Sequence, residues 1–333
     1  MPALSPQRIF ETLAAFQRTA ALRAAIELDL FTAIGEGADT TAMLAQRCSA
    51  SERGLGILAA YLVMIGFLQK HDERYSLAAD TAAFLDRRSP ACIGEAAAET
   101  ISGKAQAAAF ATLTEAVRRG GTALPGGGTL APEHPIWVEF ARAMGVPGAF
   151  LARLLADSLD QEAKGPTKVL DIAAGHGLYG IEFAKRNPDA EVFAVDWPEV
   201  LAIARGNADT AGVGPRFHSI PGDALTVDFG TGYDLALITN FLPDLKTTTV
   251  MLERIHSALV KDGCVAAFEL MLDDDRTSPA AAVSLNLALL ATTPGGEART
   301  PSQLAKSLES AGFGRVELRE LPPVPNRVMI AYK

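Results

Sequence analysis

The first hundred residues place apolar side chains at the spacing of α-helices. One apolar face of a predicted N-terminal helix consists of Ile9, Leu13, Phe16 and Ala20. Two more helices are predicted over residues 40–48 and 51–65, because Thr40 and Ser51 stand where capping side chains are expected. Gly66 follows the second of these helices and is expected to end it.

A short hairpin is predicted directly after these helices. Residues 67–70 and 75–77 are strand-like, and the polar turn His71-Asp72-Glu73-Arg74 separates them. Helices followed by such a hairpin form the order of a winged helix, a fold that often binds DNA. The predicted helices carry few basic residues, whereas DNA binding requires clustered Lys and Arg. We therefore expect this mainly helical domain, residues 1–95, to serve a packing role.

A helical region is predicted next, over residues 96–164. It contains a helical block that begins near residue 93 and ends at residue 119, then a loop rich in Gly and Pro at residues 120–132. One long helix is predicted over residues 134–160. Its apolar positions, most of them expected in the core, include Trp137, Phe140, Met144 and Phe150.

After Pro166 strand-like and helical segments alternate. The predicted strands cover residues 168–172, 191–195, 216–220, 234–239 and 264–270, with helices that end at residues 187, 210 and 259. Such alternation is typical of βαβ units and a parallel sheet, so residues 165–333 are predicted to form an α/β, Rossmann-like domain. Two further strands, residues 314–320 and 327–332, predict an antiparallel C-terminal hairpin at the sheet edge.

Composition narrows the class of protein. A net charge of −9 argues against broad nucleic-acid binding. The longest apolar run, residues 56–68, is too short to span a bilayer, and the N-terminus lacks the pattern of a signal peptide. The three dispersed cysteines, Cys48, Cys92 and Cys264, fit a reducing compartment. The cytoplasm is therefore the expected location, without a nucleic-acid or membrane partner.

A glycine loop follows the first strand of the α/β domain. Gly175-His176-Gly177-Leu178-Tyr179-Gly180 contains the pattern G-x-G-x-x-G and opens a helix. Glycines here allow a tight turn and a close approach of the backbone to a ligand, and the His176 backbone is expected to matter more than its ring. Asp196 ends the second strand at the distance expected for a carboxylate that binds ribose hydroxyls. A dinucleotide and S-adenosylmethionine both fit this pattern.

Acidic residues at successive strand ends favour S-adenosylmethionine. Asp171 lies just before the glycine loop, where a carboxylate would repel a pyrophosphate but hold the amino group of a methionine moiety. Asp223, after the third strand, is placed to accept a hydrogen bond from an adenine amino group, and Trp197 offers a flat face beside the adenine. Together with Asp196, these acids suit a cationic or neutral ligand rather than a polyanion.

Over nearly its whole length the chain resembles class I S-adenosylmethionine-dependent methyltransferases of the small-molecule O-methyltransferase family, which includes plant phenolic and bacterial natural-product enzymes. Residues 21–31, ALRAAIELDLF, resemble the family's dimerisation helix, and residues 293–300, TPGGEART, its Gly-Gly-x-x-Arg-Thr segment. Residues 311–313 resemble the turn before its last strands. The resemblance implies a homodimer with interlocking winged-helix domains, and a small-molecule substrate pocket between that domain and the Rossmann-like one.

The resemblance also implies roles for single residues. The cofactor-binding residues would be Asp171, Gly175, Gly177, Asp196, Trp197, Asp223, Ala224 and Asn240. The first three would contact the methionine part and ribose, and Ala224 would join Asp223 at the adenine. Phe140 and Met144 would lie close to the sulfonium and substrate, with core packing as their alternative role.

The family pattern breaks in the segment Asn240-Phe241-Leu242-Pro243-Asp244-Leu245, after the fourth strand. Many members carry here a histidine that removes a proton from the acceptor hydroxyl, a task that suits a neutral imidazole. The matching position in this chain is Pro243, which has no titratable group. Two carboxylates that flank the histidine in the family are retained, Glu269 at the end of strand five and Glu297 in the Gly-Gly segment.

Four explanations for the missing base stay open. Another residue serves as base, and Asp244, Glu269, Glu297 and His134 are the candidates. Alternatively no base is needed, since alignment can supply about 7–11 kcal/mol of a barrier. A third explanation is that the acceptor atom is carbon or nitrogen. A fourth is that methylation has been lost. No cluster with metal-ligand spacing is found, so no metal is expected.

The function predicted from the sequence is therefore that of a cytosolic, dimeric O-methyltransferase of secondary metabolism. Its acceptor would be a small aromatic or conjugated molecule. The alternative from another class is a DNA-binding regulatory protein that senses S-adenosylmethionine. The low basic content of the winged-helix region counts against this alternative.

Overall fold

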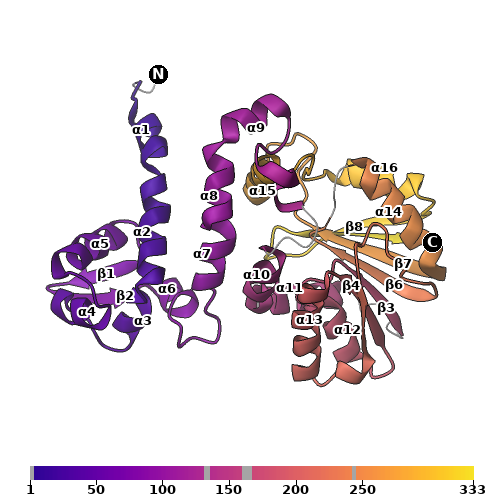
Figure 1. Cartoon of the computed structure of the whole chain (residues 1–333), viewed down its shortest axis with the longest axis horizontal. Coiled ribbons are helices and arrows are strands. Elements are labelled where there is room, and N and C mark those ends of the chain that lie inside the picture. Colours follow the sequence, from indigo (N-terminus) through magenta and orange to yellow (C-terminus); the bar gives the residue numbers. More distant parts are fainter. Residues whose placement is uncertain (1–3, 131–135, 160–166, 242–244) are drawn as a thin grey trace. The chain divides into compact units, whose positions relative to one another are not determined.

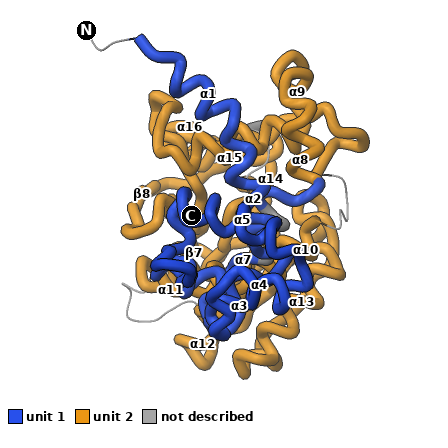
Figure 2. Tube along the Cα trace, turned by 90° about the vertical axis from the view of Figure 1, so that its left-hand side faces the viewer, with its two compact units in different colours: residues 1–104 blue, residues 105–333 orange. Residues whose placement is uncertain are grey.

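The computed structural model describes residues 4–130, 136–159, 167–241 and 245–333 (Figure 1). The chain forms two compact units, Met1–Lys104 and Ala105–Lys333, which Figure 2 shows in two colours. The division after Lys104 falls within the helical region that the sequence assigns to residues 96–164. The finer boundaries after residues 95 and 164 stay predictions.

The first unit is helical and contains one small hairpin. Its elements are α1 (Gln7–Ala14), α2 (Phe16–Glu27), α3 (Leu30–Gly35), α4 (Thr41–Arg47), α5 (Glu52–Met64), β1 (Leu68–His71), β2 (Arg74–Leu77), α6 (Ala79–Phe84) and α7 (Gly94–Ser102). The side chains of Thr40 and Ser51 accept hydrogen bonds from backbone N–H groups of Met43 and Gly54, and so cap α4 and α5. The predicted caps and the helix–hairpin order are confirmed.

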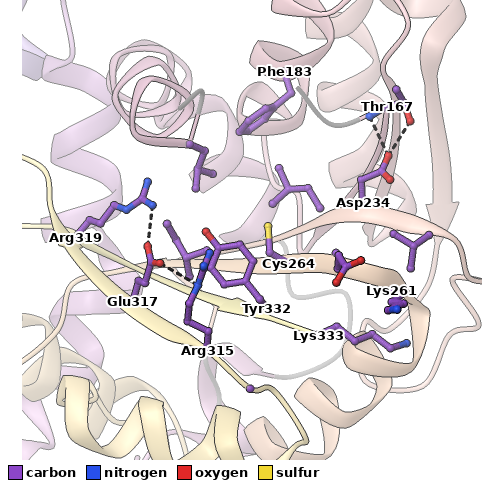
Figure 3. Close-up of a pocket in the computed structure, with 17 residues that line it drawn as sticks. Thr167, Phe183, Asp234, Lys261, Cys264, Arg315, Glu317, Arg319, Tyr332 and Lys333 are labelled. Carbon is purple, nitrogen blue, oxygen red and sulfur yellow. Dashed lines mark hydrogen bonds and ion pairs between the residues drawn. The ribbon is translucent and has the colours of Figure 1, made fainter. Parts of the chain in front are cut away.

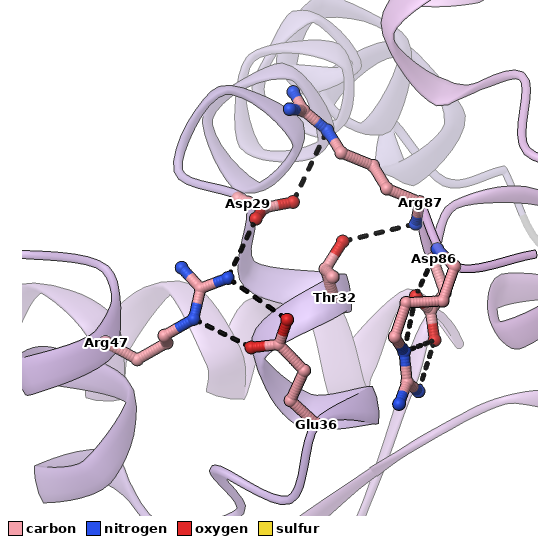
Figure 4. Close-up of polar contacts among 7 residues, drawn as sticks. Asp29, Thr32, Glu36, Arg47, Asp86 and Arg87 are labelled. Carbon is pink, nitrogen blue, oxygen red and sulfur yellow. Dashed lines mark hydrogen bonds and ion pairs between the residues drawn. The ribbon is translucent and has the colours of Figure 1, made fainter.

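A compact apolar core holds the first unit together. Its almost fully buried members include Leu30, Phe31, Leu44, Leu55, Leu62 and Leu68. At the surface of this unit Arg47 binds both Asp29 and Glu36, and Arg87 binds Asp29 (Figure 4). Exposed ion pairs of this kind contribute little to stability, so the apolar core is its main source.

The predicted N-terminal helix is divided at Ala15 into α1 and α2, and this unit does not bury the predicted apolar face. Ile9, Leu13 and Phe16 are 61%, 70% and 70% exposed, and α1 contains no buried residue. A row of large exposed apolar side chains is typical of an interaction surface. Ile9 and Leu13 lie on α1 and Phe16 begins α2; we call these three residues the α1 face.

The second unit contains one sheet and, among its described residues, the following α-helices. They are α8 (Lys104–Ala111), α9 (Leu113–Arg119), α10 (Ile136–Ala143), α11 (Gly145–Leu159), α12 (Leu178–Arg186), α13 (Pro198–Thr210), α14 (Leu245–Ala258), α15 (Ala280–Thr292) and α16 (Pro301–Ser310). The prediction of one helix over residues 134–160 is wrong, because α10 ends and α11 begins around Met144. Pro147, in the first turn of α11, has no N–H to donate to the Ala143 carbonyl, so a continuous helix would lose that hydrogen bond.

The sheet is mainly parallel, as predicted. Its strands are β3 (Lys168–Ile172), β4 (Glu191–Asp196), β5 (Phe217–Pro221), β6 (Tyr233–Thr239), β7 (Leu259–Glu269), β8 (Val316–Glu320) and β9 (Arg327–Tyr332), in the spatial order β5-β4-β3-β6-β7-β9-β8. Strands β3 to β7 pair in parallel, whereas β9 is antiparallel to β7 and to β8. The predicted C-terminal hairpin at the sheet edge is confirmed.

Side chains along each strand alternate between two cores, one on each face of the sheet. On β3, Val169 packs with residues of α11, α12 and α13, whereas its neighbour Leu170 packs with residues of α14 and α16. Helices therefore cover both faces (Figure 1). The strand order reverses between β3 and β6, and in such sheets ligands bind at the carboxyl ends of the strands near this reversal.

Candidate active site

Asp171 lies beneath the glycine loop, near the carboxyl end of β3. Its side chain is fully buried, and Oδ2 accepts a hydrogen bond of 3.1 Å from the Gly180 N–H in the first turn of α12. Oδ1 has no hydrogen-bond partner among the residues that the structure describes. Burial raises the pKa of Asp171 from 3.8 to about 7; the Gly180 hydrogen bond opposes this rise, and the charge of Asp196 adds to it. The unfilled oxygen is suited to a cationic hydrogen-bond donor.

Asp196, the last residue of β4, fixes the glycine loop. Its Oδ2 accepts from the Gly175 N–H at 2.8 Å, and its Oδ1 accepts from the Trp197 N–H at 2.7 Å. Burial raises the pKa of this carboxyl group against the effect of the two hydrogen bonds. The Asp196 carbonyl oxygen accepts from the Gly222 N–H at 3.0 Å, which ties the loop that carries Asp223 to the same edge. Acidic side chains therefore stand at the ends of three adjacent strands.

The loop after β5 and the start of α13 form the next part of this edge. Asp223 Oδ1 accepts from the Leu225 N–H at 2.9 Å, so one of its oxygens stabilises a turn. The Ala224 side chain packs in the core, and its carbonyl oxygen accepts from Arg254. A contact between Ala224 and a ligand would therefore use its backbone N–H. Trp197 is the residue that precedes α13.

Glycine is required at residues 177 and 180, because α12 begins in close contact with α13 and β4. Gly177 has a φ of +72°, and a Cβ at this position would lie 2.8 Å from the Cβ of Ala204 on α13. A Cβ at Gly180 would lie 2.5 Å from the Val192 side chain and 3.0 Å from Asp171 Oδ2. Larger residues would push α12 away from the sheet and from Asp171.

A second polar group lies at the ends of β6 and β7. The buried Glu269 ends β7, and its Oε1 accepts from the Phe241 N–H at 2.9 Å. Burial raises the pKa of Glu269 from 4.5 to about 8, while the Phe241 hydrogen bond and the charge of Arg299 oppose the rise. Asn240 has a φ of +52°; its N–H donates to a β7 carbonyl, and its Oδ1 accepts from Asn326 at 3.4 Å. Asn240 and Phe241 begin the segment that lacks the family's histidine. They are thus held by hydrogen bonds to β7 and to the link between β8 and β9.

Two further residues near the carboxyl ends of the strands were not among the predicted site residues. The buried Arg299 donates from Nη2 to Thr248 Oγ1 on α14 at 3.1 Å. Tyr179, in the first turn of α12, is buried, and burial together with the charges of Asp171 and Glu269 raises the pKa of its phenol. The pKa of Tyr179 therefore depends on the charges of both carboxylates. The Gly-Gly-x-x-Arg-Thr segment pointed to Arg299, whereas no sequence signal pointed to Tyr179.

Other predicted site residues are placed differently or not described. Glu297 is partly exposed and binds Arg276, and no described contact joins it to Glu269. Phe140 is partly exposed on α10, which packs against α13, and Met144 lies between α10 and α11. The candidate bases Asp244 and His134, together with Pro243, lie outside the described residues.

A cavity of about 920 Å³ lies at the other ends of the strands, along the starts of β6 and β7 and the hairpin strands β8 and β9 (Figure 3). Several of its charged side chains bind one another or the backbone: Glu317 pairs with Arg315 and Arg319, and Asp234 accepts from the Thr167 N–H. The buried acids lie at the opposite, carboxyl ends of the parallel strands. These carboxyl ends are therefore the stronger candidate for the active site.

Among the described residues, no three His, Cys, Asp or Glu side chains come together as metal ligands. None of the helices within the described ranges is long and apolar enough to cross a membrane.

Comparison with known proteins assigns both parts of the chain. The model of the O-methyltransferase domain matches residues 140–314, and the model of the O-methyltransferase dimerisation domain matches residues 10–87. The first match alone covers more than half of the chain. Both parts of the predicted resemblance are confirmed.

Similar proteins extend over almost the whole chain. The tetracenomycin polyketide synthesis 8-O-methyl transferase TcmO of Streptomyces glaucescens is 28% identical over 318 residues, which are 92% of this chain and 91% of the relative. The 3-hydroxy-5-methyl-1-naphthoate 3-O-methyltransferase of Streptomyces sahachiroi is 28% identical over 325 residues, 95% of this chain and 92% of the relative. A solved structure from Nostoc punctiforme PCC 73102, assigned as an O-methyltransferase, is 44% identical, covers 99% of this chain and 100% of its own, and has a TM-score of 0.96. The chain belongs to the O-methyltransferase family, whose methyl donor is S-adenosylmethionine.

Proposed function

We propose that this protein methylates an oxygen atom of a small aromatic or conjugated secondary metabolite, and that it does so in the cytoplasm without the family's usual histidine base. The acceptors named for two relatives, a tetracenomycin polyketide and a hydroxynaphthoate, support this class of substrate. The observation that carries the proposal is the row of acids at the ends of β3, β4 and β5, with the unfilled Asp171 Oδ1 among them.

S-adenosylmethionine fits this edge by charge and by its hydrogen-bond donors. Its amino group would donate to Asp171 Oδ1, and its positive charge would favour the ionised forms of Asp171 and Asp196, whose pKa values burial raises. Each oxygen of Asp196 has a second lone pair, so ribose hydroxyls can add to the bonds from Gly175 and Trp197. The second oxygen of Asp223 would accept from the adenine. When bound, this cofactor supplies an electrophilic methyl group.

Glu269 is the described residue best suited to accept the proton of the acceptor hydroxyl. Its pKa, which burial raises to about 8, is closer to the value of about 10 of a phenol than that of an ordinary glutamate, and this favours general-base catalysis. Glu297 is held by Arg276 in a partly exposed position. We therefore place Glu269 first among the candidate bases.

Activity assays with acceptors of graded acidity test this assignment. Release of S-adenosylhomocysteine would be measured with hydroxynaphthoates and substituted phenols, using wild type, Glu269→Gln and the control Glu297→Gln. If Glu269 is the base, Glu269→Gln lowers kcat by about 10²–10⁴-fold for weakly acidic phenols and much less for nitrophenols that are already ionised. An equal loss for all acceptors would instead mean that Glu269 only positions the segment at Phe241.

A homodimer is part of the proposed function. The α1 face is exposed, and it lies within or beside the matched dimerisation domain, residues 10–87. Leu13→Glu is expected to shift the protein from dimer to monomer in light scattering, because it introduces a charge into an apolar contact. A wild-type monomer at micromolar concentration would contradict the dimer.

A further inference from the structure

His176, inside the glycine loop, uses its ring as well as its backbone. The ring is 6% exposed and stacks on Tyr179, with ring centroids 5.4 Å apart and an interplanar angle of 30°. Its Nδ1 accepts a hydrogen bond of 3.1 Å from the Leu178 N–H. Its carbonyl oxygen accepts from Asn207 Nδ2 on α13 at 2.9 Å. The expectation that the backbone of His176 matters more than its ring therefore overlooked the contacts of the ring.

The other side of the ring lies directly against α11. A Cβ at Gly148 would lie 2.2 Å from His176 Nε2 and 2.8 Å from Cε1. The backbone of α11 therefore touches the imidazole, and a side chain at residue 148 would displace it. Since α11 also packs along α12, the ring occupies the point where α11, α12 and the glycine loop meet.

The hydrogen bond requires one protonation state of the ring. To accept from the Leu178 N–H, Nδ1 must be unprotonated, and the neutral ring then carries its proton on Nε2. Burial lowers the pKa of His176 to about 4, so the ring is neutral throughout the physiological range. The Leu178 N–H is one of the first donors of α12, which have no acceptor within the helix.

The glycine loop is consequently fixed at both ends. Asp196 accepts from the Gly175 N–H at the start, and His176 accepts from the Leu178 N–H at the end. We propose that His176 is a positioning residue, whose ring transmits the position of α11 to the glycine loop and holds the loop ready for the cofactor. The inference rests on the cofactor site proposed above.

Calorimetric binding of S-adenosylhomocysteine tests the role of the hydrogen bond without turnover. His176→Ala should raise Kd by about tenfold, the size of one net hydrogen bond to the backbone. His176→Asn offers an oxygen acceptor in a similar place and should restore Kd to within about threefold of wild type, whereas His176→Phe keeps a ring without an acceptor and should not. His218→Ala is the matched control, since His218 also stacks on an aromatic ring, Phe193, but lies partly exposed on β5.

A double-mutant cycle tests the contact with α11. Gly148→Ala should raise Kd by about tenfold in the presence of the histidine ring, and by less than about twofold in the His176→Ala background, where the space of the ring is empty. Melting temperatures of all variants would be recorded alongside. This pair keeps the inference testable even if one single variant folds poorly.

Three results would overturn the inference. One is a Kd within twofold of wild type for folded His176→Ala. Another is equal rescue by His176→Phe and His176→Asn, which would leave packing as the whole effect. The third is additivity of Gly148→Ala with His176→Ala. If wild type itself failed to bind S-adenosylhomocysteine, the proposed cofactor site would fall, and the inference with it.

Discussion

Replacing Asp171 by asparagine should make the ligand-free protein more stable at pH 8 and at the same time weaken cofactor binding. Asparagine has nearly the same shape, and its oxygen can still accept from the Gly180 N–H. The variant lacks the negative charge, which wild type must bury next to Asp196 without a partner for Oδ1. The charge therefore costs stability until a cation binds beside it.

The size of the effect follows from the pKa of Asp171. The value rises from 3.8 to about 7 on folding, a change of about 3 units that corresponds to at most about 4 kcal/mol. Between these two values the folded state binds more protons than the unfolded state, so raising the pH destabilises the folded protein. Relative to Asp171→Asn, wild type should lose about 2–3 kcal/mol of unfolding free energy between pH 5 and pH 8.

Urea denaturation at pH 5, 6, 7 and 8 would measure this difference, with calorimetry for S-adenosylmethionine binding at pH 8. The matched control is Asp234→Asn, at the opposite edge, because Asp234 Oδ2 already accepts from the Thr167 and Lys168 N–H groups. That variant should be less stable than wild type by about 1–2 kcal/mol. A stability difference for Asp171→Asn that stays constant from pH 5 to 8, or cofactor affinity equal to wild type, would refute the reasoning.

Three further substitutions test other parts of the site and fold. Asp196→Ala removes the acceptor of the Gly175 N–H and the proposed ribose contact, so calorimetry should show a Kd for S-adenosylmethionine at least about tenfold higher with the fold retained. Thr300→Ala removes half of the capping box with Gln303 at the start of α16 and should lower the unfolding free energy by about 1 kcal/mol in urea. The control is Ser302→Ala, because the Ser302 side chain is exposed and binds Asp274 rather than the start of the helix. Pro243→His returns an imidazole to the family's base position, and a pH–rate profile identical to wild type would show that this segment does not decide proton transfer.

The fold could be predicted closely because its signals are local. The caps Thr40 and Ser51, the alternation of strands and helices after Pro166 and the C-terminal hairpin each depend on a few neighbouring residues. The break at Met144 was missed for the same reason. The apolar spacing continues through residues 134–160, and it outweighed the one residue, Pro147, that a continuous helix cannot accommodate without losing a hydrogen bond.

Candidate site residues could be named from the sequence only where a motif marks them. The glycine pattern and the acids at strand ends indicate Asp171 and Asp196, but the full burial of Asp171 depends on how closely α12 approaches it at Gly180, which only the fold determines. The contact of His176 with Gly148 joins residues 28 positions apart, and no periodicity indicates it. Residue type and spacing thus identify candidate ligand groups, whereas their desolvation and partners emerge only from packing.

The protonation of two buried carboxylates, Asp171 and Glu269, bears both on cofactor binding and on the absence of the family's histidine. In the ligand-free protein Asp171 and Glu269 have pKa values of about 7 and about 8, so near neutral pH each is protonated in a substantial part of the molecules. A cationic ligand at this edge favours the ionised forms, and its binding must therefore release protons and become tighter as the pH rises from 6 to 8. If Glu269 is the base, as proposed above, a bound cofactor lowers its pKa below the ligand-free value of about 8 and raises the fraction in the ionised form that can accept a proton. Under the proposal that Glu269 is the base, a carboxylate whose ionised form the cofactor stabilises would take the place of the imidazole that Pro243 lacks.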